Sequence, residues 1–192
     1  MRLLAFRPKY LSATSGVSGI KPTVYVDSCV FISMLTGEQR KGDESAHVAG
    51  FNGELEAQES IAVTSSLTHA EILDCTLTEQ QKEVMRRLIR PPKVQVKDAS
   101  QPIMALASEI RDFYQRLKVE GKTNLPTVET PDAIHLATAI YFECPTFFTF
   151  DENDNPKGSR PKRGLIPLSG VVAGRYPLII CKPYSKSLGL NL

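Results

Sequence analysis

The stretch Val24-Tyr25-Val26-Asp27-Ser28 decides the fold, because a β-rich run passes directly into the start of a helix. Val, Tyr and Val favour a strand, and the run stops at the acid Asp27. Ser28 is a residue type that caps helices, and the apolar residues after it recur at helical spacing up to Gly37. We therefore expect a strand over 23–26 that is followed at once by a helix.

Short apolar runs and helical patterns alternate along the rest of the chain. Two further runs are candidate strands: Pro167 restricts 165–168 to a sheet edge, and 178–181 has no assigned neighbour. The alternation predicts an α/β fold in which helices flank a central parallel sheet of four to five strands. The remaining strands are expected at 61–64, 94–96 and 147–150, and the helices after Asp43 and near 67–73, 78–90, 100–119 and 133–142.

The composition indicates one globular domain with basic segments at both ends. The 192 residues are 42% hydrophobic and 23% charged, which suits a single sizeable core. The net charge of +2 conceals an acidic body, because residues 1–24 and 155–192 carry four and seven bases and no acid. Such ends attract a polyanion or are simply solvated. We divide the chain into a basic N-terminal extension (1–22), a folded domain (23–168) and a basic C-terminal extension (169–192).

The cysteines and the apolar runs indicate a cytoplasmic protein. The four cysteines form no C-x-x-C pair, so neither a zinc ribbon nor a disulfide scaffold is expected. No apolar run approaches the ~20 residues that span a bilayer, and the N-terminal run is too short for a secretory signal. We expect a cytoplasmic location without membrane contact.

Four acids are candidates for a shared site. Asp27 and Asp151 each follow a predicted strand directly, and the carboxyl ends of parallel strands meet at one edge of a sheet. Glu71 lies in the helix after the second strand, and Asp132 follows Pro131 at a helix start. Each acid alone has an ordinary alternative as a surface or helix-terminal carboxylate. Only their meeting in the fold indicates a functional site.

Clustered carboxylates require a cation, because they repel one another unless a divalent ion lies between them. Ligation by oxygen alone selects Mg²⁺ or Mn²⁺ rather than Zn²⁺. Such an ion activates a water molecule and stabilises a phosphodiester displacement. We therefore assign catalytic and metal-ligand roles to Asp27, Glu71, Asp132 and Asp151, and predict hydrolysis of a nucleic-acid backbone.

Four segments resemble the signature blocks of PIN-domain ribonucleases, especially the VapC-type toxins of toxin–antitoxin pairs. They are residues 24–28, 64–71, 131–139 and 148–151. The resemblance covers about 23–168 and keeps the order and approximate separation of all four acids. It implies a PIN-like three-layer fold, a Mg²⁺-dependent endoribonuclease activity, frequent dimerisation and inhibition by a cognate antitoxin.

The resemblance also implies supporting residues, and the sequence departs from the family pattern at a few positions. Ser28 and Thr149 match hydroxyl positions that help to hold the metal or the acids. Cys29 stands where many members have Asn, and the residues after Asp151 lack the usual Asp-Phe, although Asp154 is a candidate extra acid. These departures bear on identity as a toxin more than on nuclease chemistry.

Two groups of basic residues are candidate contacts for an RNA backbone. One group follows Asp151 closely, and the other forms a stripe on the predicted 78–90 helix, where solvated charge is the ordinary alternative. His69 and His135 lie within apolar helical patterns, and we expect structural or hydrogen-bonding roles for both. The RNA-binding candidates are Lys157, Arg160, Lys162, Arg163, Arg86 and Arg90.

Two other functions stay open on the sequence alone. One is a Mg²⁺-dependent phosphohydrolase of small phosphate esters with Asp27 as the nucleophile, although that chemistry usually places a second acid where Cys29 stands. The other is a non-catalytic PIN-like module that binds RNA or protein, which the four acids argue against. The sequence favours RNA hydrolysis by the toxin of a type II toxin–antitoxin system.

Overall fold

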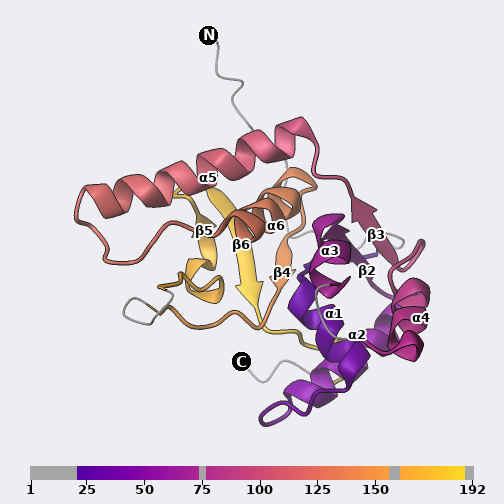
Figure 1. The fold of residues 1–192 in the computed structure, drawn as a ribbon. Coiled ribbons are helices and arrows are strands. Elements are labelled where there is room, and N and C mark those ends of the chain that lie inside the picture. Colours follow the sequence, from indigo (N-terminus) through magenta and orange to yellow (C-terminus); the bar gives the residue numbers. More distant parts are fainter. Residues whose placement is uncertain (1–20, 74–76, 156–160, 189–192) are drawn as a thin grey trace, which may run out of the picture.

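A six-stranded sheet forms the centre of the protein in a computed structural model that describes residues 21–73, 77–155 and 161–188 (Figure 1). Its strand order is β3-β2-β1-β4-β6-β5, and every neighbouring pair is parallel except β5 and β6. The predicted α/β class is confirmed, with more strands than expected. The strands are β1 (Thr23–Val26), β2 (Ile61–Ser65), β3 (Val94–Lys97), β4 (Thr146–Phe148), β5 (Gly170–Val172) and β6 (Tyr176–Cys181).

Helices cover both faces of the sheet and complete three layers. α5 (Gln101–Val119) and α6 (Thr130–Tyr141) pack against each other over one face, with α5 at the top of the view in Figure 1. The second face carries the remaining α-helices, in which α1 contacts each of the other three. These helices are α1 (Ser28–Thr36), α2 (Glu44–Glu56), α3 (Leu67–Leu73) and α4 (Glu79–Leu88).

The strands divide their side chains between two hydrophobic cores. Successive residues of a strand point to opposite faces, so Tyr25 joins the core under α5 and α6, whereas Val24 and Val26 join the core under α1 and α2. Phe147 and Phe148 divide in the same way. Both faces of the central strands are therefore buried, as the near-continuous apolar runs of the sequence predict.

The strand order reverses between β1 and β4, and this point sets the position of the site. From β1 the chain continues to β2 and β3 on one side, whereas β4 and β6 lie on the other side. In open α/β sheets the crevice at such a switch point lies beyond the carboxyl ends of the strands. Asp27 and Asp151 follow these two strands, and the Asp27 N–H donates to the Phe148 carbonyl of β4 at 3.0 Å.

Residues 165–168 do not form the predicted edge strand. Ile166–Leu168 is a short 3-10 helix (η1), and Pro167 stands inside it. The N–H groups of Leu165 and Ile166 both donate to the Asp151 carbonyl, at 3.0 and 2.9 Å. Because both N–H groups bond to Asp151, they are not available to pair with a neighbouring strand.

Residues after 168 are part of the sheet rather than an appended segment, which corrects the C-terminal extension of the sequence analysis. β6 pairs in parallel with β4, and β5 pairs with β6. Alternate residues of β6 are buried, so this strand completes the core under α5 and α6. The chain then ends its described part in a second 3-10 helix, η2 (Lys186–Leu188). Within the described ranges, no helix is both long and apolar enough to cross a membrane.

Candidate active site

Asp27 is held in place by groups from both strands of the switch point. Its Oδ1 accepts the N–H of Ser28 at 2.7 Å, which caps α1 through the carboxylate rather than through the predicted serine hydroxyl. Thr149, just after β4, donates its hydroxyl to Asp27 Oδ2 at 2.7 Å. The Cys29 thiol lies 3.2 Å from the same oxygen. Asp27 is buried, with 7% of its surface exposed, and these contacts orient both of its carboxylate oxygens.

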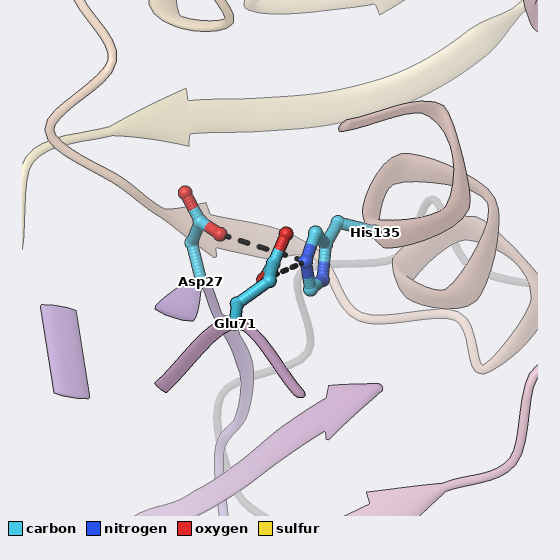
Figure 2. A group of neighbouring side chains, drawn as sticks. All are labelled: Asp27, Glu71 and His135. Atoms are coloured by element: carbon cyan, nitrogen blue, oxygen red, sulfur yellow. Dashed lines mark hydrogen bonds and ion pairs between the residues drawn. The ribbon is translucent and has the colours of Figure 1, made fainter. Parts of the chain in front are cut away.

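Glu71 meets a buried histidine that the sequence analysis had set apart from the four acids. The Nε2 atom of His135 lies 2.8 Å from Glu71 Oε2 and 3.9 Å from Asp27 Oδ1. Figure 2 shows Glu71 from α3 and His135 from α6 pointing toward one another beside Asp27. Ligating atoms of these three residues lie within 4.8 Å of one another. The chain that leaves β2 and enters α3 thus brings Glu71 to the same edge of the sheet as Asp27.

Hydrogen bonds from the sheet favour one tautomer of the His135 ring. The N–H of Ser65 donates to the Tyr25 oxygen at 3.0 Å, and this oxygen lies 2.6 Å from His135 Nδ1. Burial raises the pKa of Tyr25 well above its usual value, so the hydroxyl keeps its proton and directs it to Nδ1. The Nε2–H group of His135 is then left to donate to Glu71.

This tautomer makes His135 a support for Glu71 rather than a metal ligand. A nitrogen that binds a metal ion must present a lone pair. In this tautomer Nε2 carries a proton, so it has no lone pair to offer. Burial works against the charge on Glu71, but its hydrogen bond to His135 lowers the pKa of Glu71 overall. Glu71 is therefore kept ionised and oriented, as a carboxylate ligand requires.

Asp132 is the acid whose surroundings in the folded chain are least favourable to its charge. It lies in the first turn of α6. Its pKa is raised to about 7, chiefly by burial, with the charge of Lys162 opposing the rise and the charges of Asp27 and Asp151 adding to it. Its Oδ2 atom is buried and has no hydrogen-bond partner within the described part of the chain. A cation at this oxygen would supply the missing partner.

Asp151 joins the cluster from the end of β4, together with a lysine. Its Oδ2 lies 3.0 Å from Lys162 Nζ. Burial raises the pKa of Asp151, the contact with Lys162 opposes this, and the charges of Asp27 and Glu129 add to the rise. Asp27 is therefore common to two groups of acids: it lies beside Glu71 and His135, and its charge raises the pKa values of Asp132 and Asp151.

The gathered residues suit a divalent cation with oxygen ligands. Asp27 lies beside Glu71, and the charges of Asp27 and Asp151 raise the pKa of Asp132. The buried Oδ2 atoms of Asp132 and Asp151 lack a hydrogen-bond partner among the described residues, although Asp151 Oδ2 has the ion pair with Lys162. The nitrogen of His135 is engaged, and the Cys29 thiol is kept protonated because burial raises its pKa well above the usual value. The available donors are therefore carboxylate oxygens, the ligands that Mg²⁺ and Mn²⁺ prefer.

The predicted supporting residues take three different positions. Thr149 is buried and bonded to Asp27, while Ser28 lies between Asp27 and Glu71, close enough for its hydroxyl to lower the pKa of Glu71. Asp154 is exposed and uses Oδ1 to accept the Gly164 N–H at 2.9 Å, so it shapes the loop after β4. Asp154 is thus a loop-closing residue here rather than an observed member of the acidic cluster.

The basic candidates are also divided by the structure. Arg163 is only 6% exposed and points inward, with its guanidinium stacked over the Tyr114 ring, so it presents no surface to RNA. Arg86 is exposed and paired with Glu83 at 3.0 Å on its own helix, α4. Lys157 and Arg160 lie outside the described residues. Arg90 is exposed, and RNA contacts by it and by Arg86 stay predictions.

Tyr25 is a site residue that the sequence analysis missed. Its side chain is fully buried in a strand whose neighbours are valines. A buried tyrosine usually finds a hydrogen-bond partner for its hydroxyl, and this preference was the available signal. The partner, His135, lies 110 positions away along the chain, so its identity depended on the fold.

The comparisons with known proteins agree with this geometry. The sequence profile of the PIN domain matches residues 24–154, a segment that includes all four acids. The chain belongs to the PIN domain family. PIN domains are characteristically nucleases, which supports hydrolase activity at this edge. Among curated proteins, none has a significantly matching sequence.

Two solved structures align with this chain at low sequence identity. A toxin–antitoxin complex from Klebsiella pneumoniae aligns with 19% identity and a TM-score of 0.50, over 84% of this PIN protein and 98% of that chain. A VapBC2 complex from Rickettsia felis, bound to a DNA fragment from its promoter, aligns with 17% identity and a TM-score of 0.47, over 66% and 86% of the two chains. At 19% identity the likeness to the Klebsiella pneumoniae complex concerns the fold alone.

Proposed function

We propose that this PIN protein is a divalent-metal-dependent endoribonuclease that hydrolyses RNA phosphodiester bonds. The observation that carries the proposal is the buried carboxylate oxygen of Asp132, which has no hydrogen-bond partner among the described residues and lies within electrostatic reach of Asp27 and Asp151. A chain gains no stability from such an arrangement in the absence of a cation. A bound divalent ion supplies a Lewis acid that polarises a phosphoryl oxygen and lowers the pKa of a water molecule.

The residues of the chain have distinct parts in this proposal. Asp27, Glu71, Asp132 and Asp151 hold the cation. Thr149 and the Ser28 N–H keep both oxygens of Asp27 oriented through bonds of 2.7 Å. His135 keeps Glu71 ionised and aimed at the same place. Because these orienting groups come from the sheet and from two helices, the ligands are arranged before substrate arrives.

We further propose that the protein is the toxin of a type II toxin–antitoxin pair. The four sequence blocks resemble VapC-type toxins, and the Klebsiella pneumoniae protein with this fold was solved in a toxin–antitoxin complex. An antitoxin partner, dimerisation and action in the cytoplasm belong to the same proposal. Induced expression is then expected to arrest growth of a bacterial host, whereas expression of Asp27→Asn is not.

Removal of the metal is the direct test of nuclease activity. Purified protein is incubated with end-labelled RNA, with single-stranded DNA of the same sequence, and with p-nitrophenyl phosphate, in Mn²⁺, Mg²⁺ or EDTA. We expect RNA cleavage with either ion and none in EDTA, because the four acids would then lack their cation. Fragment patterns are read on a sequencing gel.

Two results would point elsewhere. Cleavage that survives Asp27→Asn would identify a contaminating nuclease. Turnover of p-nitrophenyl phosphate without RNA cleavage, lost on the same substitution, would favour the small-ester phosphohydrolase. That alternative is disfavoured here because position 29 carries a thiol, 3.2 Å from Asp27, instead of a second acid.

A further inference from the structure

We propose that Lys162 takes the place of a second divalent ion in this site, so that the protein binds one metal ion per chain and uses the lysine ammonium as its other cation. The inference rests on the proposed function. It is carried by the position of Lys162 Nζ, 3.0 Å from Asp151 Oδ2, on the side of the cluster where Asp132 also lies.

The backbone of Lys162 is fixed relative to the strand that carries Asp151. Its N–H and carbonyl exchange two hydrogen bonds of 2.8 Å with Asn155, in an antiparallel bridge. Two residues on, the Gly164 N–H donates to Asp154 at 2.9 Å. The returning chain is thus bonded along its length to the segment that leaves β4, and the lysine is not on a free loop tip.

Close backbone packing and a hydrogen bond to Pro126 also hold this returning segment in place. A Cβ atom on Gly164 would lie 2.9 Å from the Asn153 carbonyl carbon, so the two backbones touch and only glycine fits. Arg163 points to the interior, where its Nε donates to the Pro126 carbonyl at 2.9 Å. Successive side chains of extended backbone point to opposite sides, so an inward Arg163 directs Lys162 toward the acids.

The surroundings of Lys162 are those of a resident cation. Its ammonium is engaged by Asp151 and lies within electrostatic reach of Asp132 and Glu129, and it is 38% exposed at the side chain. Burial opposes its charge, but these carboxylates raise the pKa of Lys162 overall. A second divalent ion would need oxygens of Asp132 and Asp151, and there it would meet this positive charge at short range. The solvent-facing part of the ammonium is free to meet a phosphate oxygen.

Mn²⁺ binding tests the inference without relying on catalysis. Stoichiometry and affinity are measured on the full chain by electron paramagnetic resonance of free Mn²⁺ and by calorimetry, for the unaltered protein, Lys162→Met, Lys162→Arg and Lys82→Met. Lys82 is the matched control, because it has the same kind of contact, 2.6 Å from Glu79, and is 36% exposed, but lies on α4.

We expect one Mn²⁺ per chain for the unaltered protein, Lys162→Arg and Lys82→Met. Lys162→Met is expected to bind a second Mn²⁺, or to bind Mn²⁺ about tenfold more tightly, since a like charge has been removed. Two ions on the unaltered protein would overturn the inference, even if Lys162→Met fails to fold. Equal stoichiometry and affinity for Lys162→Met and the unaltered protein would overturn it as well. Absence of any Mn²⁺ binding would instead refute the proposed function.

Discussion

Asp132→Asn is expected to reduce RNA cleavage by about 1000-fold or more and, in the absence of metal, to stabilise the fold. Loss of this charge removes a metal ligand, and metal ions contribute several kcal/mol to such transition states, where each 1.36 kcal/mol is a factor of ten. Loss of the charge also explains the gain in stability. The charge of Asp132 is disfavoured by burial and by the neighbouring charges of Asp27 and Asp151, and its Oδ2 atom lacks a hydrogen-bond partner in the described structure. An amide at this position carries no charge to bury.

The stabilisation should depend on pH in a defined way. The pKa of Asp132 rises from 3.8 in the unfolded chain to about 7 in the folded protein. A group with a raised pKa favours folding while it is protonated, so stability is fully present below pH 3.8 and falls as the pH rises toward about 7. The difference between the two pKa values corresponds to at most ~4 kcal/mol, and coupling among the acids reduces our expectation to about 2 kcal/mol.

Urea denaturation at pH 5 and pH 8, with and without Mg²⁺, measures these effects. In EDTA the unaltered protein should lose stability between the two pH values, and Asp132→Asn should lose less. Mg²⁺ should stabilise the unaltered protein more than the variant, because a ligand stabilises only the state that binds it. Asp112→Asn, at an exposed acid on α5, is the control and should change neither activity nor this pH dependence. A variant of Asp132 that is less stable than the unaltered protein at pH 8 in EDTA would contradict the buried-charge explanation.

Tyr25→Phe is expected to destabilise the protein by about 2–3 kcal/mol and to weaken metal binding by about 10–100-fold. The substitution keeps the ring in the core but removes the hydroxyl that joins Ser65 to His135. A buried N–H group and the Nδ1 atom of His135 then lose their partners. His135 is free to change tautomer, and Glu71 loses its fixed donor.

The matched control is Tyr114→Phe. Tyr114 is also buried, and its hydroxyl also accepts a backbone N–H, from Ala173 at 3.0 Å, but it belongs to α5, and its ring contacts Arg163 rather than His135. Tyr114→Phe should lower the free energy of unfolding by an amount similar to that of Tyr25→Phe and leave Mn²⁺ affinity and RNA cleavage unchanged. The ¹⁵N shifts of the His135 ring report the tautomer directly in the unaltered protein. Equal effects of the two substitutions on Mn²⁺ affinity would show that the relay has only a structural role.

The parts of the fold that follow from local patterns were predictable from the sequence. The strands and helices up to α6 are marked by short β-rich runs, helical spacing and turn residues. Asp27 and Asp151 follow strands, Asp132 lies at a helix start, and Glu71 lies within the helix after the second strand. Because parallel strands end at one edge, the position of Asp27 and Asp151 side by side follows from the class of fold alone.

The parts that depend on distant contacts were not predictable. β6 reads in the sequence as a short apolar run, and only the three-dimensional fold shows that it pairs with β4. The contact of Lys162 with Asp151 depends on the closure of a loop whose two sides are bonded to each other. The relay through Tyr25 joins residues from β1, β2 and α6, and no local pattern connects them.

The pairing of β6 with β4 makes the last part of the chain responsible for the ligand arrangement at the first strand. The Thr149 N–H donates to the Cys181 carbonyl at 3.0 Å, and the Thr149 hydroxyl in turn fixes Asp27. A shortened protein that stops at residue 168 would keep every candidate metal ligand but would expose the edge of β4 and lose this support. The minimal unit that preserves the geometry of the acids therefore extends at least through Cys181, well past the last of the acids in the sequence.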